Sequence, residues 1–370
     1  TMVISSTAGT ADGGTSNVAA FALTFTSNEP TSNFIVSDIT ATGGDDCTLS
    51  ALGVTSTTIY TATCTRSNGE TGNVVVAAST YTDEAGNDNA VSNTFDWTFD
   101  STDPTMAITS TAGTADGGTS GVAAFALTFT SSETTANFVV GDITATGGDG
   151  CTLGNFAQGG SAAIYTATCT ASTGETVNVL VAADAYTDTA GNGNTVSNTF
   201  DWTWDGTGPT MVITSATVAS GSSTNTGAAV FVYTSNEVTT DFALVDITVT
   251  ECVNADFTTA GNGLVYGSTC TEDSNGVTPT VLVAAGAFND AMGNDNSVSN
   301  TYTWTYDTTS PTIGITSIAG DGYVNEDEYA TNGFDVVGTV SGANGQTVTV
   351  DYGGASATCA AASGAFTCTF

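Results

Sequence analysis

The sequence contains an internal repeat, and this feature limits the possible folds more than any other. The segment Thr1-Met2-Val3-Ile4 returns at spacings of 104, 105 and 102 residues, as segments that begin at Thr105, Thr210 and Thr312. Each later start follows a proline (Pro104, Pro209, Pro311), which lacks a backbone donor and marks a strand boundary. The period indicates tandem modules. We predict domains at residues 1–104, 105–209 and 210–311, followed by a partial, divergent domain at 312–370 that stops before its closing strands.

The hydrophobic pattern inside each module has a period of two. In the first module it predicts strands over Val18–Thr26, Tyr60–Thr65, Asn73–Ala78 and Thr94–Phe99. No stretch has a helical period. Many short strands in about 100 residues, separated by Gly, Asn and Asp turns, predict an all-β protein of antiparallel Greek-key sandwiches. Trp97, Trp202 and Trp304 fall in the last strand of each module, where we expect them to pack in the core.

The charge of the chain excludes most kinds of active site. The 370 residues include 37 Asp and Glu, one basic residue (Arg66) and no histidine, so the formal net charge is -36. Histidine relays, Schiff-base lysines and P-loops are therefore absent, and a chain this acidic repels nucleic acid. A hydrophobic content of 40% is enough for packed cores. Carboxylate chemistry and the binding of hard cations remain, and we expect no enzyme.

Three segments of each module resemble a known family. The segments SNEPTSNFIVSDIT (Ser27 to Thr40), IYTATC (Ile59 to Cys64) and YTDEAGNDN (Tyr81 to Asn89) are similar to the bacterial immunoglobulin-like repeats of large cell-surface proteins and adhesins. The resemblance covers residues 1 to about 310 and implies tandem immunoglobulin-like sandwiches that act mainly as spacers. Residues 320–354 are similar to another immunoglobulin-like repeat type, found in giant biofilm adhesins.

The eight cysteines form one pair in each module. Their even number, their pairing within repeats and the absence of a C-x-x-C motif predict disulfides rather than thiolate metal sites. Disulfides indicate an extracellular compartment, secreted or attached to the cell surface. The expected pairs are Cys47 with Cys64, Cys151 with Cys169, Cys252 with Cys270, and Cys359 with Cys368.

Oxygen-bearing side chains repeat in register at three places. Such loops provide the six to eight oxygen ligands that Ca²⁺ requires, although Asp and Asn are also ordinary turn formers. The first set lies in one loop per module: Asp83, Asn87 and Asn89; Asp188, Asn192 and Asn194; Asp290, Asn294 and Asn296. The second set lies at the joints: Asp100 with Asp103, then Asp205 and Asp307. The third set pairs Glu29 with Asp38, Glu133 with Asp142 and Glu237 with Asp246.

The third set has an alternative interpretation, and the fourth module contains a further acidic cluster. Paired carboxylates such as Glu29 and Asp38 are used by glycosidases, but an active site copied in three modules is rare. In the fourth module Asp321, Asn325 and Asp327 form an acidic cluster with Glu328, in the type of segment where related adhesin repeats carry calcium. It is not an EF-hand, because Glu326 stands where the glycine should be.

These observations predict an extracellular rod of immunoglobulin-like sandwiches, each crosslinked by a disulfide, and stiffened by Ca²⁺. The expected function is that of a stalk or spacer in a cell-surface adhesin. The alternative is a subunit that polymerises into a filament, sheath or surface layer, with a strand such as Thr1–Ser5 completing the fourth module of a neighbour. The expected partners are other copies of the chain or other surface proteins and cells. Nucleic acid and direct membrane insertion are excluded, and exposed aromatic residues are the one feature that suggests a glycan partner.

Overall fold

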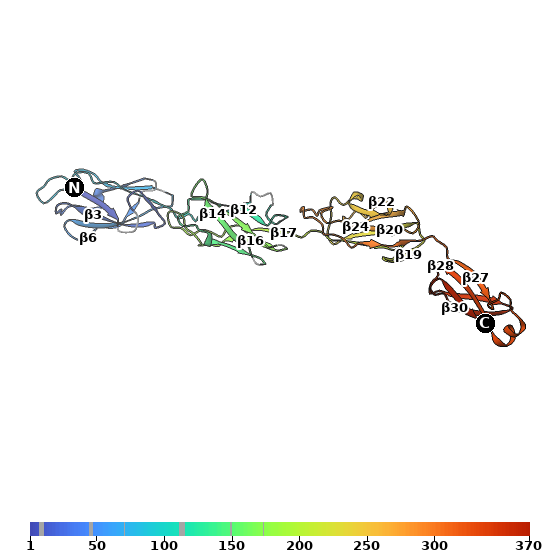
Figure 1. Ribbon diagram of the computed structural model, residues 1–370. Coiled ribbons are helices and arrows are strands. Elements are labelled where there is room, and N and C mark those ends of the chain that lie inside the picture. Colours follow the sequence, from blue (N-terminus) through green and yellow to red (C-terminus); the bar gives the residue numbers. More distant parts are fainter. Residues whose placement is uncertain (7–10, 44–46, 70, 111–114, 149, 173) are drawn as a thin grey trace. The chain divides into compact units, whose positions relative to one another are not determined.

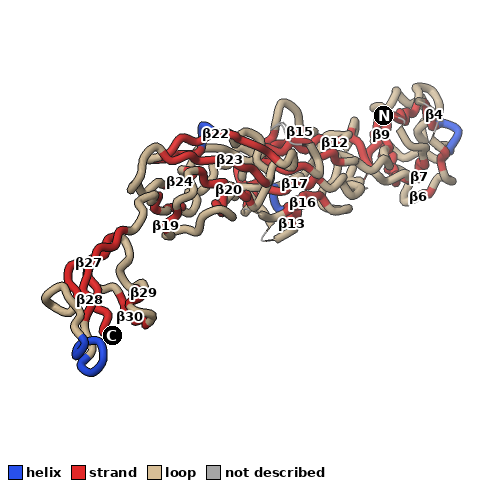
Figure 2. Tube along the Cα trace, turned by 90° about the vertical axis from the view of Figure 1, so that its right-hand side faces the viewer, coloured by secondary structure: helices blue, strands red, loops and turns tan. Residues whose placement is uncertain are grey.

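The computed structural model describes residues 1–370 except 7–10, 44–46, 70, 111–114, 149 and 173. The chain forms two compact units, Thr1–Thr207 and Gly208–Phe370. Each unit contains two separate hydrophobic cores. The domain boundaries predicted at residues 104, 209 and 311 stay predictions. Figure 2 shows strands and loops throughout, with short helical segments between them.

The first repeat is a sandwich of two sheets. One sheet has the order β1-β3-β7-β5, with β6 also paired to β7, and the other has the order β2-β9-β8-β4. All pairs are antiparallel except β2 with β9, which is parallel. The elements are β1 (Met2–Ser6), β2 (Gly14–Ser16), β3 (Ala20–Ser27), η1 (Val36–Asp38), β4 (Ile39–Thr42), β5 (Thr48–Leu49), β6 (Gly53–Val54), β7 (Ile59–Thr65), β8 (Thr71–Val76) and β9 (Phe95–Phe99).

The second repeat has the same two sheets, in the orders β10-β12-β15-β14 and β11-β17-β16-β13. Figure 1 labels β12, β14, β16 and β17 in this part of the chain. Its elements are β10 (Met106–Ser110), β11 (Gly118–Ser120), β12 (Ala124–Ser131), η2 (Val140–Asp142), β13 (Ile143–Thr146), β14 (Thr152–Gln158), β15 (Ile164–Thr170), β16 (Thr176–Val181) and β17 (Phe200–Trp204).

The third repeat keeps this pairing but divides its second sheet. The sheets are β18-β20-β23-β22, β21-β24-β25 and β19-β26. The elements are β18 (Met211–Ser215), β19 (Ser223–Thr224), β20 (Ala228–Ser235), η3 (Leu244–Asp246), β21 (Ile247–Thr250), β22 (Cys252–Thr259), β23 (Val265–Glu272), β24 (Thr280–Val283), β25 (Tyr302–Thr303) and β26 (Thr305–Tyr306).

The fourth repeat is smaller. Its sheets are β27-β28-β31 and β29-β30. In β27, Ile313 and Ile315 are 62% and 58% exposed, whereas Met2 and Ile4 at the aligned positions of β1 are buried. The elements are β27 (Thr312–Ile318), η4 (Glu328–Asn332), β28 (Asp335–Ser341), β29 (Thr347–Tyr352), β30 (Ala355–Ala360) and β31 (Ala365–Thr369).

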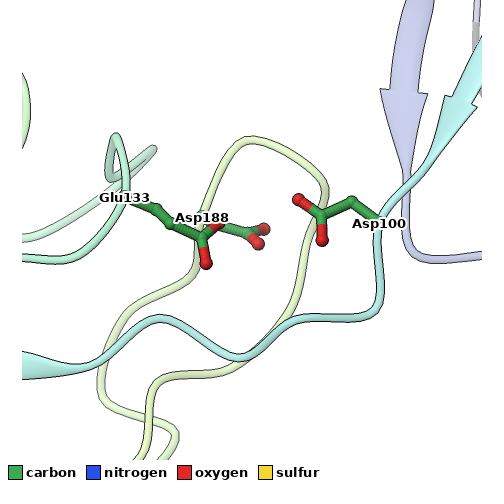
Figure 3. Close-up of side chains that lie close together, drawn as sticks. All are labelled: Asp100, Glu133 and Asp188. Atoms are coloured by element: carbon green, nitrogen blue, oxygen red, sulfur yellow. The ribbon is translucent and has the colours of Figure 1, made fainter. Parts of the chain in front are cut away.

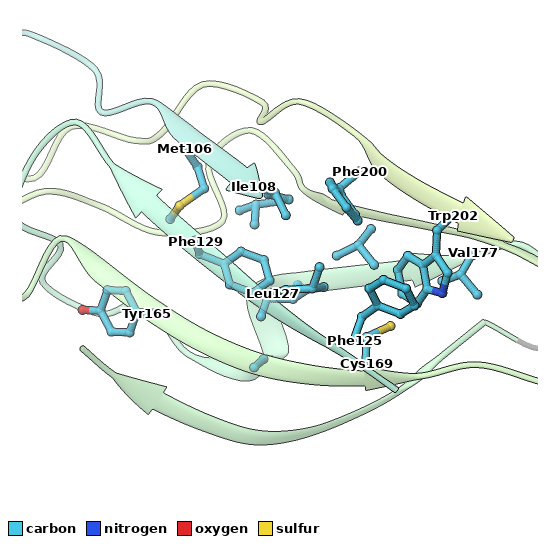
Figure 4. Close-up of a cluster of buried hydrophobic side chains, with 14 of the residues drawn as sticks. Met106, Ile108, Phe125, Leu127, Phe129, Tyr165, Cys169, Val177, Phe200 and Trp202 are labelled. Atoms are coloured by element: carbon cyan, nitrogen blue, oxygen red, sulfur yellow. The ribbon is translucent and has the colours of Figure 1, made fainter. Parts of the chain in front are cut away.

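The cores follow from the alternation along the strands. In β12, Phe125, Leu127 and Phe129 point inward and are fully buried, and Trp202 of β17 packs on Phe125 with ring centroids 4.7 Å apart (Figure 4). Trp97 and Trp304 are buried in the same way, which confirms that the tryptophans belong to the cores.

The four predicted disulfides are present, with Cα–Cα distances of 5.0 to 5.6 Å, as the side-chain geometry requires. In the first three repeats each disulfide closes a loop of 17 or 18 residues. Loops of this length are stabilised by about 3 kcal/mol in the chain-entropy model.

Side-chain amides join the first strand of a repeat to the segment that precedes its last strand. The Asn93 Oδ1 atom accepts the Ile4 N–H at 2.7 Å, and its Nδ2 atom donates to the Ile4 carbonyl at 3.0 Å. Asn198 and Asn300 make the same pair of bonds to Ile108 and Ile213. The strand Met2–Ser6 is therefore held in its own repeat, so the hypothesis that Thr1–Ser5 serves as a donor strand requires β1 to leave a formed sheet.

Candidate metal centre

Three carboxylates from separate segments meet in the first unit. Asp100 follows β9, Glu133 follows β12, and Asp188 lies in the loop between β16 and β17. One oxygen from each lies within 4.8 Å of the other two, and Figure 3 shows the carboxylates close together. Asp188 is 2% exposed, while Asp100 and Glu133 are half-buried.

The Asp188 carboxylate is oriented by its own loop. Its Oδ1 atom accepts the N–H groups of Gly191 at 2.6 Å and Asn192 at 2.8 Å. Its Oδ2 atom accepts the Asn192 amide at 2.9 Å. Short polar side chains that bond to backbone a few residues ahead are the usual means of closing such turns. The carboxylate is thereby fixed before any ligand arrives.

Asp100 is positioned by contacts with its own repeat and with the second repeat. Its backbone N–H donates to the Ser16 carbonyl at 3.0 Å, and its own carbonyl accepts the Asn192 amide at 2.8 Å. Asn17 donates to the carbonyls of Ala190 and Gly191 at 3.0 and 2.8 Å. The loop that carries Asp188 therefore binds directly to the end of the first repeat.

The cluster is electrostatically unfavourable without a cation. Burial raises the pKa of Glu133 above its usual value, and the charges of Asp100, Asp188 and Asp103 raise it further. Arg66, the single basic side chain of the sequence, lies over Trp97 in the first core. The donor set consists of oxygens alone, which is the chemistry that Ca²⁺ and Mg²⁺ select.

In calcium-free buffer we expect the variant Glu133→Gln to be more stable than the native chain at pH 7. At a pH below the ordinary pKa of glutamate, Glu133 is protonated in both folded and unfolded chains. Because the folded pKa is raised, the stabilisation present at that low pH is lost as the pH rises through the folded pKa. Glutamine avoids this loss. Urea unfolding of both proteins from pH 3 to 8 measures the difference.

The quantity to measure is the difference in the free energy of unfolding between the native chain and Glu133→Gln, because Asp201 also contributes to the pH dependence of stability. Burial and the neighbouring Asp116 raise the pKa of Asp201. This contribution is common to both proteins and cancels. Parallel stability profiles for the native chain and Glu133→Gln would contradict the electrostatic argument.

In the corresponding loop of the first repeat, Asp83 occupies the position of Asp188. The Asp83 Oδ1 atom accepts the N–H groups of Ala85 and Asn87, and the Oδ2 atom accepts the Asn87 amide, each at 2.8 Å. The Asn87 side chain lowers the pKa of Asp83. Glu29, Asp83 and Asp88 line a hollow of about 180 Å³ together with Thr1 and Asn28. Among the described residues these carboxylates do not form a group whose oxygens all lie within 4.8 Å of one another, so they offer a comparison for the cluster of Asp100, Glu133 and Asp188.

The loop of the third repeat is closed by the same bonds. The Asp290 Oδ1 atom accepts the N–H groups of Met292 and Asn294, and its Oδ2 atom accepts the Asn294 amide at 2.8 Å. Burial raises the pKa of Asp290, but the hydrogen bonds from Asn294 outweigh this effect and lower it.

The third residue of each predicted ligand set bonds to the backbone of its own loop. The Asn194 Oδ1 atom accepts the Tyr186 N–H at 2.9 Å, and its Nδ2 atom donates to the carbonyls of Ala182 and Thr195 at 2.7 Å. Asn89 and Asn296 make the same pattern of bonds. These amides hold the loop closed, and the ligand role predicted for them stays a prediction.

The remaining sequence candidates are Asp103, in the first unit, and the acidic segment of the fourth repeat, in the second unit. Asp103 acts on Glu133 through its charge. In the fourth repeat, Asp321 accepts the Tyr323 N–H, and Asn325 and Glu328 cap each other's backbone. Asp327 precedes η4 in the same segment. The calcium prediction for Asp321, Asn325 and Asp327 stays a prediction.

Asp38 and Glu29, the candidate glycosidase pair, have different partners. The Asp38 Oδ2 atom caps η1 by accepting the Ile35 N–H at 2.8 Å, as Asp142 and Asp246 do at η2 and η3. Glu133 was recognised in the sequence only as a member of this type of pair. Its position after β12, two residues beyond the buried Ser131, is the signal that could have placed it at the end of the repeat beside Asp188.

Comparisons with known proteins bear on the fold. A sequence profile described as a bacterial Ig-like domain matches residues 1–98 and 100–203. The search of curated proteins gives no match. No helix among the described residues is long and apolar enough to cross a membrane.

Several solved structures are similar to the chain at low sequence identity. Invasin, described as a bacterial integrin-binding protein, is 11% identical with a TM-score of 0.36, over 98% of this chain and 74% of invasin. InvD of Yersinia pseudotuberculosis is 13% identical with a TM-score of 0.32, over 99% of this chain and 81% of InvD. The S-layer protein rSbsC is 11% identical with a TM-score of 0.20, over 97% of this chain and 62% of that protein.

Proposed function

Because this chain belongs to the bacterial Ig-like domain family, we propose that it is a non-enzymatic extracellular protein whose repeats form the stalk of a cell-surface adhesin. The four disulfides support an oxidising location outside the cell. The separate cores support a spacer role, since each repeat brings its own stability. The high negative charge disfavours nucleic acid and anionic lipid as partners and leaves surface proteins and cells.

Calcium would stiffen this stalk at the joint between the first two repeats. The observation that carries the proposal is the meeting of Asp100, from the end of the first repeat, with Glu133 and Asp188 of the second. The residues fit the ion: three carboxylates can supply up to six oxygens, and Asp188 is already fixed by its loop. A cation held there would join two segments that otherwise repel each other.

We expect Glu133→Gln and Asp100→Asn each to weaken calcium binding by at least tenfold, because each replaces a charged carboxylate with two oxygens by a neutral amide with one. Isothermal titration calorimetry of the full chain measures the affinity. Glu29→Gln is the matched control, since Glu29 occupies the aligned position but, among the described residues, belongs to no group of three carboxylates whose oxygens all lie within 4.8 Å of one another. Small-angle scattering with and without chelator tests the stiffening. Equal titrations for the native chain and Glu133→Gln, or scattering unchanged by chelator, would reject the calcium joint.

The second candidate function is a subunit of an extracellular filament, sheath or surface layer. The exposed Ile313 and Ile315 of β27 favour it, because they line a groove with Val348 and Val350 of β29 that an added strand could cover. Electron microscopy of the purified protein separates the candidates. Ordered filaments or sheets that disappear in the double variant Ile313→Thr and Ile315→Thr support the polymer, and isolated particles support the stalk.

A further inference from the structure

The exposed tyrosines of the chain gather in the fourth repeat. Tyr323, Tyr329 and Tyr352 are 80%, 54% and 37% exposed, whereas most of the eleven tyrosines are buried in the cores of the first three repeats. Tyr329 lies on η4 and Tyr352 ends β29. Neither position is needed for the metal centre or for the joint between the first two repeats. Exposed aromatic side chains grouped in this way commonly mark a binding site.

The rings of Tyr329 and Tyr352 are held in place. Their centroids are 6.2 Å apart and their planes make an angle of 59°. The Tyr329 hydroxyl donates to the Gly353 carbonyl at 3.3 Å, and Tyr352 packs against Phe334 with centroids 5.3 Å apart. Gly353 has a φ of +58°, and a Cβ there would lie 3.1 Å from the Tyr329 hydroxyl oxygen, so glycine is favoured at this position.

A hollow of about 380 Å³ lies against these two rings. Val324, Asn325, Glu326, Tyr329, Tyr352 and Gly353 line it. Its floor is apolar and aromatic, and its charged group is the carboxylate of Glu326. The neighbouring residues Asp327 and Glu328 add negative charge to the same segment, and the sequence contains no basic residue between 208 and 370.

We propose that this hollow, the tyrosine pocket, binds an organic ammonium ion such as a quaternary amine. Tyr329 and Tyr352 both line the hollow, and the face of a tyrosine ring attracts a cation. The surrounding carboxylates repel anions and favour a positively charged ligand. An inorganic calcium ion fits the pocket poorly, because it requires six to eight oxygens and the carboxylate or amide oxygens in the lining come from Glu326 and Asn325 alone. The proposal is independent of the stalk and of the calcium joint.

The test is a titration of the full-length chain with choline, followed by NMR at constant ionic strength. The control ligand is 3,3-dimethyl-1-butanol, which has the shape of choline without its charge. We expect choline to bind and the neutral analogue to bind at least tenfold more weakly. Phosphocholine tests whether the ligand is a lipid head group or a free amine. Its negative phosphate is repelled by the carboxylates, so we expect it to bind more weakly than choline. Equal affinities for choline and the neutral analogue would overturn the proposal.

Variants distinguish binding of choline in the tyrosine pocket from non-specific attraction of choline to an acidic surface. Tyr329→Leu and Tyr352→Leu should each weaken choline binding about tenfold, and Tyr329→Phe, which keeps the ring, should retain most of it. Tyr323→Leu is the matched control, because Tyr323 is exposed on the same segment but does not line the pocket. If a leucine variant disturbs the fold, the comparisons of Tyr329→Phe and of choline with its analogue still decide. Choline binding that is unchanged in folded Tyr329→Leu and Tyr352→Leu would refute the tyrosine pocket.

Discussion

Replacing Arg66 with alanine is expected to destabilise the first repeat by about 3 kcal/mol, because it empties a filled site in the core. Arg66 is 7% exposed, and its guanidinium carbon lies 5.4 Å from the ring centroid of Trp97. Its Nη2 atom donates to the Gly43 carbonyl at 2.9 Å. The substitution removes the cation–π contact, this hydrogen bond and the packing of the side chain.

Adding Gly72→Val to the Arg66→Ala protein is expected to recover most of the lost stability. Gly72 is opposite Trp97 in the β8–β9 pair, and a Cβ built on it would lie 1.5 Å from the Arg66 Nη1 atom. In the second repeat the aligned residues are Ala171 and Val177, both buried, and Val177 pairs with Trp202. The first repeat thus fills this space with Arg66, which follows β7, and the second repeat fills it with Val177 of β16. The double variant gives the first repeat the residues that the second repeat has at these two positions.

Hydrogen exchange of the full-length chain, followed on peptides from β7, β8 and β9, measures this effect in the repeat that carries it. Gly72→Val alone should also destabilise, since valine and Arg66 compete for one site. The two substitutions are therefore strongly non-additive. Peptides from β15 to β17 serve as the control and should not change. Additive effects of the two substitutions would contradict the shared site.

Much of the fold could be predicted because its causes are local. The alternation in Ala20–Ser27 places Phe21, Leu23 and Phe25 inside, and the predicted strand Val18–Thr26 differs from β3 by two residues or fewer at each end. The cysteine pairs follow from their position in the repeat. The parallel pairing of β2 with β9 is a long-range contact of a three-residue strand, and no local pattern encodes it.

The cluster of three carboxylates was predicted only in part, because its geometry joins distant segments. The sequence singled out Asp100 and Asp188 as candidates that recur at the joints and loops, but it did not pair them with Glu133. Their approach depends on hydrogen bonds between the first two repeats, such as Asn192 to the Asp100 carbonyl. Periodicity also cannot distinguish an asparagine that faces a ligand from one that bonds to its own loop. The role of Asn194 therefore needs a separate test.

The variant Asn194→Ala is expected to lower the free energy of unfolding of the second repeat by about 4 kcal/mol, because it leaves three backbone groups without partners. Asn194 is 2% exposed, and its amide bonds to Tyr186, Ala182 and Thr195. Asn194→Asp should be worse at pH 7, since a carboxylate oxygen would then face two carbonyl oxygens. Its penalty should shrink at low pH, where the carboxyl group regains a proton to donate. Hydrogen exchange on the peptides around residues 182–195 measures both.

Asn194 either holds its loop closed, which we call a clamp, or binds calcium directly as a ligand. The free energy of unfolding without calcium distinguishes these two roles. A clamp predicts that Asn194→Ala loses stability without calcium and, because the loop carries Asp188, also loses calcium affinity. A ligand predicts lower calcium affinity with unchanged stability in chelator. Glu133→Gln is the reference for a lower calcium affinity without loss of stability, since we expect it to gain stability without calcium while binding the ion more weakly. Asn192→Ala is the control within the loop: its amide joins Asp188 to the Asp100 carbonyl, so its loss should loosen the joint and leave the Asn194 bonds in place.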